Sequence, residues 1–418
     1  MVLGTALIGL GLAYILLDIY RANPDSNLLA TISLTALPRW ARAILLGAIG
    51  LAFLLLGLFR LNRTLLAPYV RPGKPVVDAI AEHRRLGRGP KVVALGGGNG
   101  LATLLRGLKE HTTNLTAIVT VADDGGSSGR LRRDLGLPPP GDVRNCLAAL
   151  SDDEDLLTQL FQYRFMDGGD LEGHSFGNLF IAALAGVTGS FDRGVLEAGR
   201  VLRIRGQVLP ATLSDVALVA DKTASLDAHE VRVQGESRIP SFPGRISRVH
   251  LEPGEPPAYP EAIRAVLGAD MIVIGPGSLY TSILPNLLVP DLVGAIRASR
   301  AFKVYVCNVA SQPGETDGYD CGQHLAALES HVGGGLVDGI LVNNCILPNL
   351  PERIRPVPLA KESNLTVPSF PADVVDPERP WRHDSEKLAH VLLRLLEERT
   401  GPLDMTPIDR AQSPTHLN

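Results

Sequence analysis

The pattern of apolar and polar positions divides the 418-residue chain into an apolar N-terminal part and a longer part with α/β patterning. Met1 to Leu17 and Ala43 to Phe59 are each 17 residues long and carry no charge. That length is the lower limit for crossing a hydrocarbon core of about 30 Å. A buried core helix is the alternative for either run alone, but two such runs close together predict a transmembrane hairpin over residues 1–60.

Basic residues follow the second apolar run. Arg and Lys far outnumber Asp and Glu in residues 61–90, which we expect to form a linker near anionic headgroups. The positive-inside rule then places everything after residue 60 in the cytoplasm, with the hairpin in the inner (plasma) membrane. Arginines in the 18–42 connection oppose this topology in part. No positive segment precedes the first run, which argues against a signal peptide.

From Lys91 onward, short apolar runs rich in β-branched residues alternate with helical patterns. KVVAL, GGGNG, LATLLRGLKEH and LTAIVTVA predict strand, glycine loop, helix and strand, the start of a parallel sheet. The runs ADMIVIG, KVYVCNV and DGILVNN continue this pattern. We therefore expect a Rossmann-like α/β domain with a mostly parallel sheet over residues 91–400.

Two segments depart from that pattern. Short alternating runs (DVALVAD, EVRVQGE, RISRVHLE) predict a small β-rich insertion at about 208–253. Residues 401–418 are polar without a period, so we expect a disordered tail there.

Composition excludes some functions. A net charge of −4 and 5% aromatic residues argue against a general nucleic-acid binder, which carries a basic surplus or stacking platforms. The four cysteines show no CxxC pairing and no His at zinc-ligand spacing. They read as buried reduced thiols, which indicates a reducing compartment.

Glycine loops follow two of the predicted strands. Gly96 to Gly100 follows KVVAL, and Gly275 to Ser278 follows MIVI. The first loop falls short of the dinucleotide fingerprint, with Leu101 at the position of its last glycine, and lacks the GKS or GKT of a P-loop. Because ligands of open α/β sheets bind beyond the carboxyl ends of the strands, two anion-ready loops there predict a ligand with more than one phosphate. A third strand end, at Asn308, leads into SQPGETDGY and adds amides and hydroxyls.

The stretch TVADDGGSSGRLRR follows the second strand. Asp123 lies where dinucleotide folds hold a ribose hydroxyl, and Asp124 is then free for a metal or a ligand hydroxyl. Gly125 to Gly129 can present successive N–H groups to an anion. Two alternatives stay open for Arg130, Arg132 and Arg133, which either clamp phosphate or form a solvated helix face.

Two further motifs each allow more than one interpretation. Asp142, after PPPG, reads on its own as the cap of the next helix. The letters GHSFG match a hydrolase nucleophile elbow, but MDGGDLE precedes them instead of a buried strand. We therefore expect GHSFGN to open a helix, with His174 and Asn178 turned toward the ligand and Ser175 without a nucleophilic role.

The motifs GGGNG, TVADDGGSSGRLR, PPPGDVRNCLAAL, GHSFGNL, RGQVLPAT, VIGPGSLYTSILPNLLVP and PGETDGY resemble those of the YvcK family of gluconeogenesis factors. That family is related in fold to 2-phospho-L-lactate transferase (CofD). The resemblance runs from Lys91 into the 390s. It implies a UDP-sugar ligand, notably UDP-N-acetylglucosamine, and a regulator of cell shape and peptidoglycan precursor supply during gluconeogenic growth. Family members have no established reaction.

On this basis the diphosphate is expected on the two glycine loops, the sugar or ribose hydroxyls on the aspartates, and amides and imidazole around them. The expected binding residues are Gly97, Gly98, Asn99, Gly100, Asp123, Asp124, Gly126, Ser127, Ser128, Asp142, Asn145, His174, Asn178, Gly275, Gly277, Ser278, Ser282 and Asn308. We assign no catalytic residue, no required cofactor and no metal ligand, but leave Mg²⁺ at Asp124 open. The alternative is a CofD-like, metal-dependent transferase of a phosphate-linked group. We also expect an unidentified protein partner in cell-wall synthesis and leave a homo-oligomer open.

Overall fold

The computed structural model divides into two compact units, Met1–Ala81 and Glu82–Asn418. The residues that the structure describes are 9, 11, 13–15, 18–19, 21–22, 37–66, 86–152, 156–166, 169–223, 230–348, 350–361 and 364–401. Most of the first apolar run, linker residues 67–85 and tail residues 402–418 lie outside them. The predictions for those segments are therefore outside the described structure.

The first unit contains the long helix α3 (Arg39–Leu66), which includes the whole second apolar run. Because α3 continues to Leu66, the linker begins later than the predicted residue 61. Among the described residues, no single helix is long and apolar enough to cross a membrane. Two bent helix pairs of the second unit, Phe176–Thr188 with Phe191–Val201 and Leu279–Leu287 with Pro290–Ala298, meet that test on length and composition.

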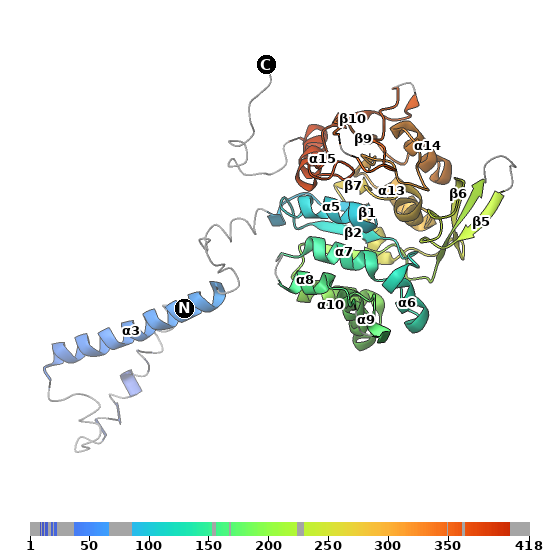
Figure 1. Ribbon diagram of the computed structural model, residues 1–418. Coiled ribbons are helices and arrows are strands. Elements are labelled where there is room, and N and C mark those ends of the chain that lie inside the picture. Colours follow the sequence, from blue (N-terminus) through green and yellow to red (C-terminus); the bar gives the residue numbers. More distant parts are fainter. Residues whose placement is uncertain are drawn as a thin grey trace. The chain divides into compact units, whose positions relative to one another are not determined.

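The second unit is built on a seven-stranded sheet in which every neighbouring pair is parallel. The strand order is β10-β9-β8-β7-β1-β2-β3 (Figure 1). The strands are β1 (Val92–Gly96), β2 (Leu115–Val119), β3 (Gln207–Pro210), β7 (Met271–Ile274), β8 (Phe302–Val306), β9 (Gly339–Asn343) and β10 (Ser369–Ala372). This confirms the predicted α/β class and the parallel sheet.

Helices cover both faces of the sheet, which explains why its central strands are continuous apolar runs. Along β1, Val92 and Ala94 pack into one core, whereas Val93 and Leu95 pack into the other. The first core is closed by α5 (Gly98–Leu108), α7 (Gly141–Leu150), α9 (Phe176–Thr188), α10 (Phe191–Val201) and α15 (Ser385–Thr400). The second is closed by α11 (Pro260–Leu267), the π-helix η3 (Leu279–Ile283), α12 (Leu284–Leu287), α13 (Pro290–Ala298) and α14 (Cys321–Val332).

The β-rich insertion is a separate antiparallel sheet of order β5-β4-β6. Its strands are β4 (Ala217–Thr223), β5 (Glu230–Gln234) and β6 (Arg245–Glu252). The predicted start at 208 is corrected, because residues 207–210 form β3 of the main sheet. The apolar side chains Leu218, Ala220, Val233 and Val249 join the second core, so the small sheet is packed onto the domain.

The connection from β2 to β3 is mostly helical. It contains α6 (Gly126–Leu135), α7, α8 (Leu156–Gln162), the short 3₁₀ helix η2 (Gly169–Leu171), α9 and α10. Figure 1 shows α7 to α10 gathered beyond the β2 side of the sheet. The loop between β2 and α6 therefore reaches the carboxyl edge of the sheet with helices packed behind it.

Candidate functional site

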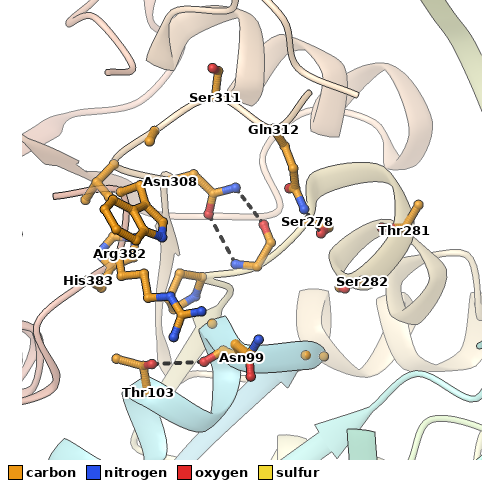
Figure 2. Close-up of a pocket in the computed structure, with 18 of the residues that line it drawn as sticks. Asn99, Thr103, Ser278, Thr281, Ser282, Asn308, Ser311, Gln312, Arg382 and His383 are labelled. Carbon is orange, nitrogen blue, oxygen red and sulfur yellow. Dashed lines mark hydrogen bonds between the residues drawn. The ribbon is translucent and has the colours of Figure 1, made fainter. Parts of the chain in front are cut away.

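The strand order reverses direction at β1, which lies between β2 and β7. Chain connections leave this point toward opposite edges of the sheet, so the loops after β1 and β7 diverge and leave a crevice. A cavity of about 450 Å³ occupies this position, and loops from both halves of the domain line it. Figure 2 shows Asn99, Ser278, Asn308 and Gln312 around it, on the segments that follow β1, β7 and β8.

The loop after β1 needs glycine for close approach. A Cβ on Gly97 would collide with the Asp142 carboxylate, and a Cβ on Gly100 would lie 2.5 Å from the Pro276 carbonyl oxygen. Gly98 has a φ of +62°, a left-handed conformation that few other residues adopt. Helix α5 begins here, and, apart from the Gly98 N–H, which bonds the Asp142 carboxylate, the N–H groups of its first turn suit an anion.

The loop after β7 is fixed by a side chain from the next strand. Gly275 and Gly277 have φ values of +81° and +159°. The Asn308 amide nitrogen donates to the Gly277 carbonyl at 2.8 Å, and its Oδ1 accepts from the Gly277 N–H at 3.2 Å. The Gln312 amide donates to the Ser278 hydroxyl. The two predicted glycine loops and the third strand end therefore meet in one cavity.

Three carboxylates line the same cavity: Asp123, Asp142 and Glu236. Burial, and then the charge of Asp123, raise the pKa of Asp142 to about 6. Burial, followed by the charges of Asp123 and Asp142, raises the pKa of Glu236 to about 8. Burial also raises the pKa of Asp123, although the Gly125 N–H donates to its carboxylate at 2.8 Å. The carboxylates therefore share negative charge that the protein does not fully balance.

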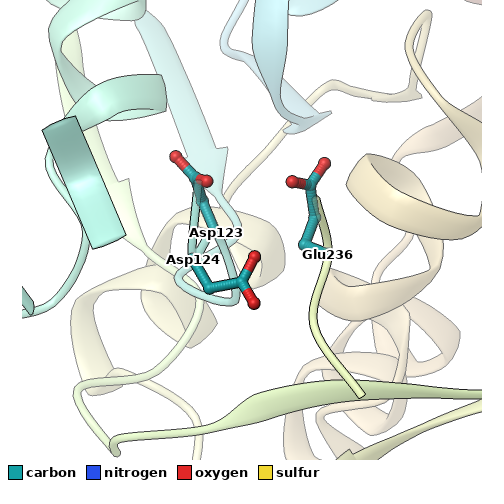
Figure 3. A group of neighbouring side chains, drawn as sticks. All are labelled: Asp123, Asp124 and Glu236. Atoms are coloured by element: carbon teal, nitrogen blue, oxygen red, sulfur yellow. The ribbon is translucent and has the colours of Figure 1, made fainter. Parts of the chain in front are cut away.

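Asp123, Asp124 and Glu236 form a second grouping. Each can offer an oxygen within 4.8 Å of the others, and Figure 3 shows their carboxylates close together. Three carboxylate oxygens are suitable ligands for a hard cation such as Mg²⁺. Sequence reasoning found no acidic partner for the aspartate pair, because Glu236 comes from the segment after β5, more than 100 residues away.

The prediction that Asp142 caps the next helix is wrong. Helix α7 has Pro140 at its N-cap, and Asp142 lies in its first turn. Its carboxylate instead reaches the β1 loop, where the Gly98 N–H donates to it. The tight contact with Gly97 is consistent with this position. Asp142 is thus part of the cavity wall.

Several residues predicted to face the ligand hold the Asp123 loop in place instead. The buried Ser127 hydroxyl is 3.0 Å from His174 Nδ1 and accepts from the Asn178 amide at 3.1 Å. Neither His174 nor Asn178 is among the described residues that line the cavity. Ser175 is the buried N-cap of α9 and accepts from the Asn178 N–H, which confirms that GHSFGN opens a helix.

The arginines that follow Gly125 to Gly129 also point elsewhere. Arg130 donates to the Glu172 carbonyl, and Arg132 donates to the Val216 carbonyl and pairs with Asp215. Arg133 is exposed. None of the three lines the cavity as the structure describes it, so the phosphate clamp is not favoured; Arg133 alone fits the solvated-face alternative, since Arg130 and Arg132 bond other parts of the protein.

A C-terminal segment that sequence reasoning missed completes the cavity. Trp381, Arg382 and His383 line it, and Figure 2 shows Arg382 extending toward the loop that carries Asn99. Asp384 caps α15 by accepting from the Glu386 and Lys387 N–H groups, which fixes the segment just before the helix. The sequence does carry a signal for this segment: Asp384 can cap a following helix, and one of the two tryptophans of the chain lies three residues before it.

His383 is 8% exposed, and neither of its ring nitrogens has a hydrogen-bond partner among the described residues. Burial lowers the pKa of His383 to about 4, so the ring is neutral at pH 7. Arg382 is the one permanently charged cation among the described cavity-lining residues. This side of the cavity therefore combines one positive charge with a neutral imidazole whose two nitrogens are buried and lack partners among the described residues.

The predicted binding residues separate into two groups. Those that line the cavity are Gly97, Gly98, Asn99, Gly100, Asp123, Asp142, Gly277, Ser278, Ser282 and Asn308. Those that are not among its lining residues are Asp124, Gly126, Ser127, Ser128, Asn145, His174, Asn178 and Gly275. All four cysteines are free, and only Cys345 is not fully buried.

The strand order and the position of the cavity define a doubly wound α/β protein of the Rossmann type. The family model described as 2-phospho-L-lactate transferase CofD matches residues 92–395. A relative from Nostoc sp. is 50% identical over 357 residues, which cover 82% of this chain and 77% of that one. The gluconeogenesis factor of Bacillus subtilis is 48% identical over 322 residues, covering 75% of this chain and 100% of that one.

A crystal structure of a UPF0052 family member from Bacillus halodurans superposes with a TM-score of 0.68 at 48% identity. It covers 73% of this chain and 99% of that one. The chain therefore belongs to the gluconeogenesis factor (YvcK, UPF0052) family and carries a CofD-like domain.

Proposed function

We propose that this protein binds a UDP-sugar, UDP-N-acetylglucosamine in the first instance, and acts as a regulator of cell shape and peptidoglycan precursor supply during gluconeogenic growth. The observation that carries the proposal is the cavity at the strand-order reversal, with a glycine loop on each side. Its volume of about 450 Å³ is in the range of cofactor and ligand sites.

The charges in the cavity suggest how such a ligand would lie. The diphosphate would face the first N–H groups of α5, the Gly277–Ser278 loop and Arg382. The sugar hydroxyls would donate to Asp123 and Asp142, because ionised carboxylates are strong acceptors. The proposed ligand would therefore contact both the positively charged side of the cavity, at Arg382, and the negatively charged side, at Asp123 and Asp142.

Titration calorimetry with UDP-N-acetylglucosamine on the detergent-solubilised full chain tests the binding step. Arg382→Ala is expected to weaken binding about tenfold or more, the worth of a charge-assisted hydrogen bond. Arg379→Ala is the matched control, since Arg379 is exposed three residues earlier and does not line the cavity. If millimolar UDP-N-acetylglucosamine gives no heat of binding, the proposal is contradicted.

The regulatory role is tested in cells. In a Bacillus subtilis strain that lacks its own gluconeogenesis factor, this chain should restore cell shape on a gluconeogenic carbon source. The Arg382→Ala variant should restore it less well at equal protein level. If the unchanged chain and the Arg382→Ala variant restore cell shape equally, the cellular role does not depend on ligand binding in this cavity.

We further propose that the N-terminal part attaches the protein to the plasma membrane as a hairpin, with the domain in the cytoplasm. In support, α3 exposes large apolar side chains, among them Trp40, Ile44, Phe53 and Phe59. Fractionation of cells that express the chain with and without residues 1–66 tests this. Recovery of the full chain in the soluble fraction would contradict membrane attachment.

The three carboxylates of Asp123, Asp124 and Glu236 are consistent with a second candidate, a metal-dependent transferase of a phosphate-linked group, which the comparisons do not favour over the regulator. Asp123, Asp124 and Glu236 would hold Mg²⁺, which would offset ligand phosphate charge. Product formation from nucleotide-activated donors, dependent on Mg²⁺ and lost in Asp124→Asn, would favour this candidate. Binding without turnover would favour the regulator.

A further inference from the structure

A second cavity, of about 670 Å³, lies between β6, the π-helix η3 and α14. It shares none of its lining residues with the first cavity. Its polar lining residues include Arg245, Ser247, Tyr280, Tyr319, Gln323 and Ser330. Figure 1 shows β6 beside α14, and the Val249 N–H donates to His331 Nε2 across that contact.

Arg245 gives this cavity a positive charge. Its guanidinium lies over the Tyr319 ring, 5.2 Å from the centroid, and bonds the Tyr319 hydroxyl. The Tyr319 and Tyr280 hydroxyls bond each other at 2.9 Å. No described carboxylate forms an ion pair with Arg245. Stacking therefore holds the guanidinium in one orientation while several of its N–H donors stay available to an anion.

The other polar groups suit hydroxyls. Gln323 accepts from the Asp320 N–H through Oε1, which leaves its amide nitrogen as a donor toward the cavity. The hydroxyls of Ser247 and Ser330 donate to the carbonyls of Asp221 and Ala327, and the Ser330 oxygen is also 3.2 Å from His331 Nδ1, so at least one lone pair of each hydroxyl remains as an acceptor. A ligand with one anionic group and several hydroxyls matches this set.

The two cavities are joined by η3. Tyr280 faces the second cavity, whereas the next two residues, Thr281 and Ser282, line the first. The buried Glu315 carboxylate accepts from the Tyr280 N–H at 3.3 Å and from the Thr281 hydroxyl at 3.0 Å. π-helical turns are rare and are frequent at functional sites. A shift of Tyr280 would therefore displace groups in the first cavity.

From this geometry we propose that the second cavity is a ligand site for a small hydroxylated anion, such as a sugar monophosphate, and that η3 links its occupancy to the first cavity. This goes beyond the proposed function and does not depend on it, because it concerns different residues and a different ligand.

The test uses glucose 6-phosphate with the detergent-solubilised full chain carrying Trp40→Phe. That substitution leaves Trp381, which lines the first cavity, as the one tryptophan. Calorimetry measures binding, and Trp381 emission reports on the first cavity. Arg245→Ala should weaken binding about tenfold, as expected for a lost charged hydrogen bond. Arg248→Ala, on the same strand but outside the cavity, should leave it within about twofold.

The expected result is saturable binding of glucose 6-phosphate, weak or absent binding of glucose, and a change in Trp381 emission that Arg245→Ala removes. Absent binding, or equal binding by glucose, would overturn the ligand class. Undiminished binding by Arg245→Ala would overturn the location. Binding at this site without any change in Trp381 emission would overturn the link through η3.

Discussion

The Asn308 side chain bonds both peptide groups of Gly277, donating to its carbonyl at 2.8 Å and accepting from its N–H at 3.2 Å. A residue at the end of β8 thus fixes the loop that follows β7. The conformation of this loop in the proposed site therefore depends in part on a side chain that follows the neighbouring strand.

Asn308→Ala should therefore weaken UDP-N-acetylglucosamine binding about tenfold, because the Gly277 loop loses two hydrogen bonds. Calorimetry measures this. Asn344→Ala is the control, since Asn344 is exposed after the next strand, β9. Equal affinity in the Asn308 variant would show that the loop does not contact the ligand.

His383→Phe should reduce ligand affinity without destabilising the fold. Both ring nitrogens lack a partner among the described residues, so an apolar ring costs no protein hydrogen bond. Calorimetry and thermal unfolding together check this. Lower stability with unchanged affinity would instead make His383 a packing residue.

Gly100→Ala should impair both stability and ligand binding. The added Cβ would lie 2.5 Å from the Pro276 carbonyl oxygen and would push the β1 and β7 loops apart. We expect a loss of about 1–3 kcal/mol in unfolding free energy, typical of overpacking. Gly186→Ala, in α9 with open space around it, should be neutral or stabilising.

Stability should fall as pH rises from about 5 to about 9, through the ionisation of Glu236. Its folded pKa, about 8, lies above the ordinary value of 4.5, so its contribution is complete below pH 4.5 and is lost as pH rises through 8. Glu236→Gln should flatten the dependence of Tm on pH in that window. Glu352→Gln, at an exposed position, should leave it unchanged.

Lys222→Met should destabilise the domain by about 3 kcal/mol, because it removes a charged donor and leaves buried carbonyls unsatisfied. The fully buried ammonium donates to the carbonyls of Ile239, Phe242 and Gly314. Those carbonyls belong to the two segments that bring Glu236 and Gln312 to the cavity, so ligand affinity should fall as well. Chemical denaturation measures stability, and Lys303→Met, a partly exposed lysine, is the control.

The sheet could be predicted because its central strands are buried on both faces and therefore appear as uninterrupted apolar runs. Val92–Gly96 and Met271–Ile274 are clear examples. The strand Ser369–Ala372 was not predicted, since its four residues are only partly apolar and only partly buried at the sheet edge.

The glycine loops could be located for the same reason, because each follows such a strand. Glu236 and His383 could not, since their place in the site depends on how the small sheet and α15 pack on the domain. His174 and Asn178 had the right chemistry, but Ser127 is their partner in the fold. Pattern therefore located the backbone of the site more reliably than its side chains.

The pairing of β1 with β7 also affects the order of events during synthesis. Lys91 bonds Asp270, 179 positions later in the chain. At about 5–20 residues per second, a ribosome needs on the order of ten to forty seconds to cover that distance. Arg382 and His383 emerge later still. A nascent or truncated chain therefore has half of its cavity without the other half, and a ligand that needs both halves would bind only after translation has reached the end of the domain.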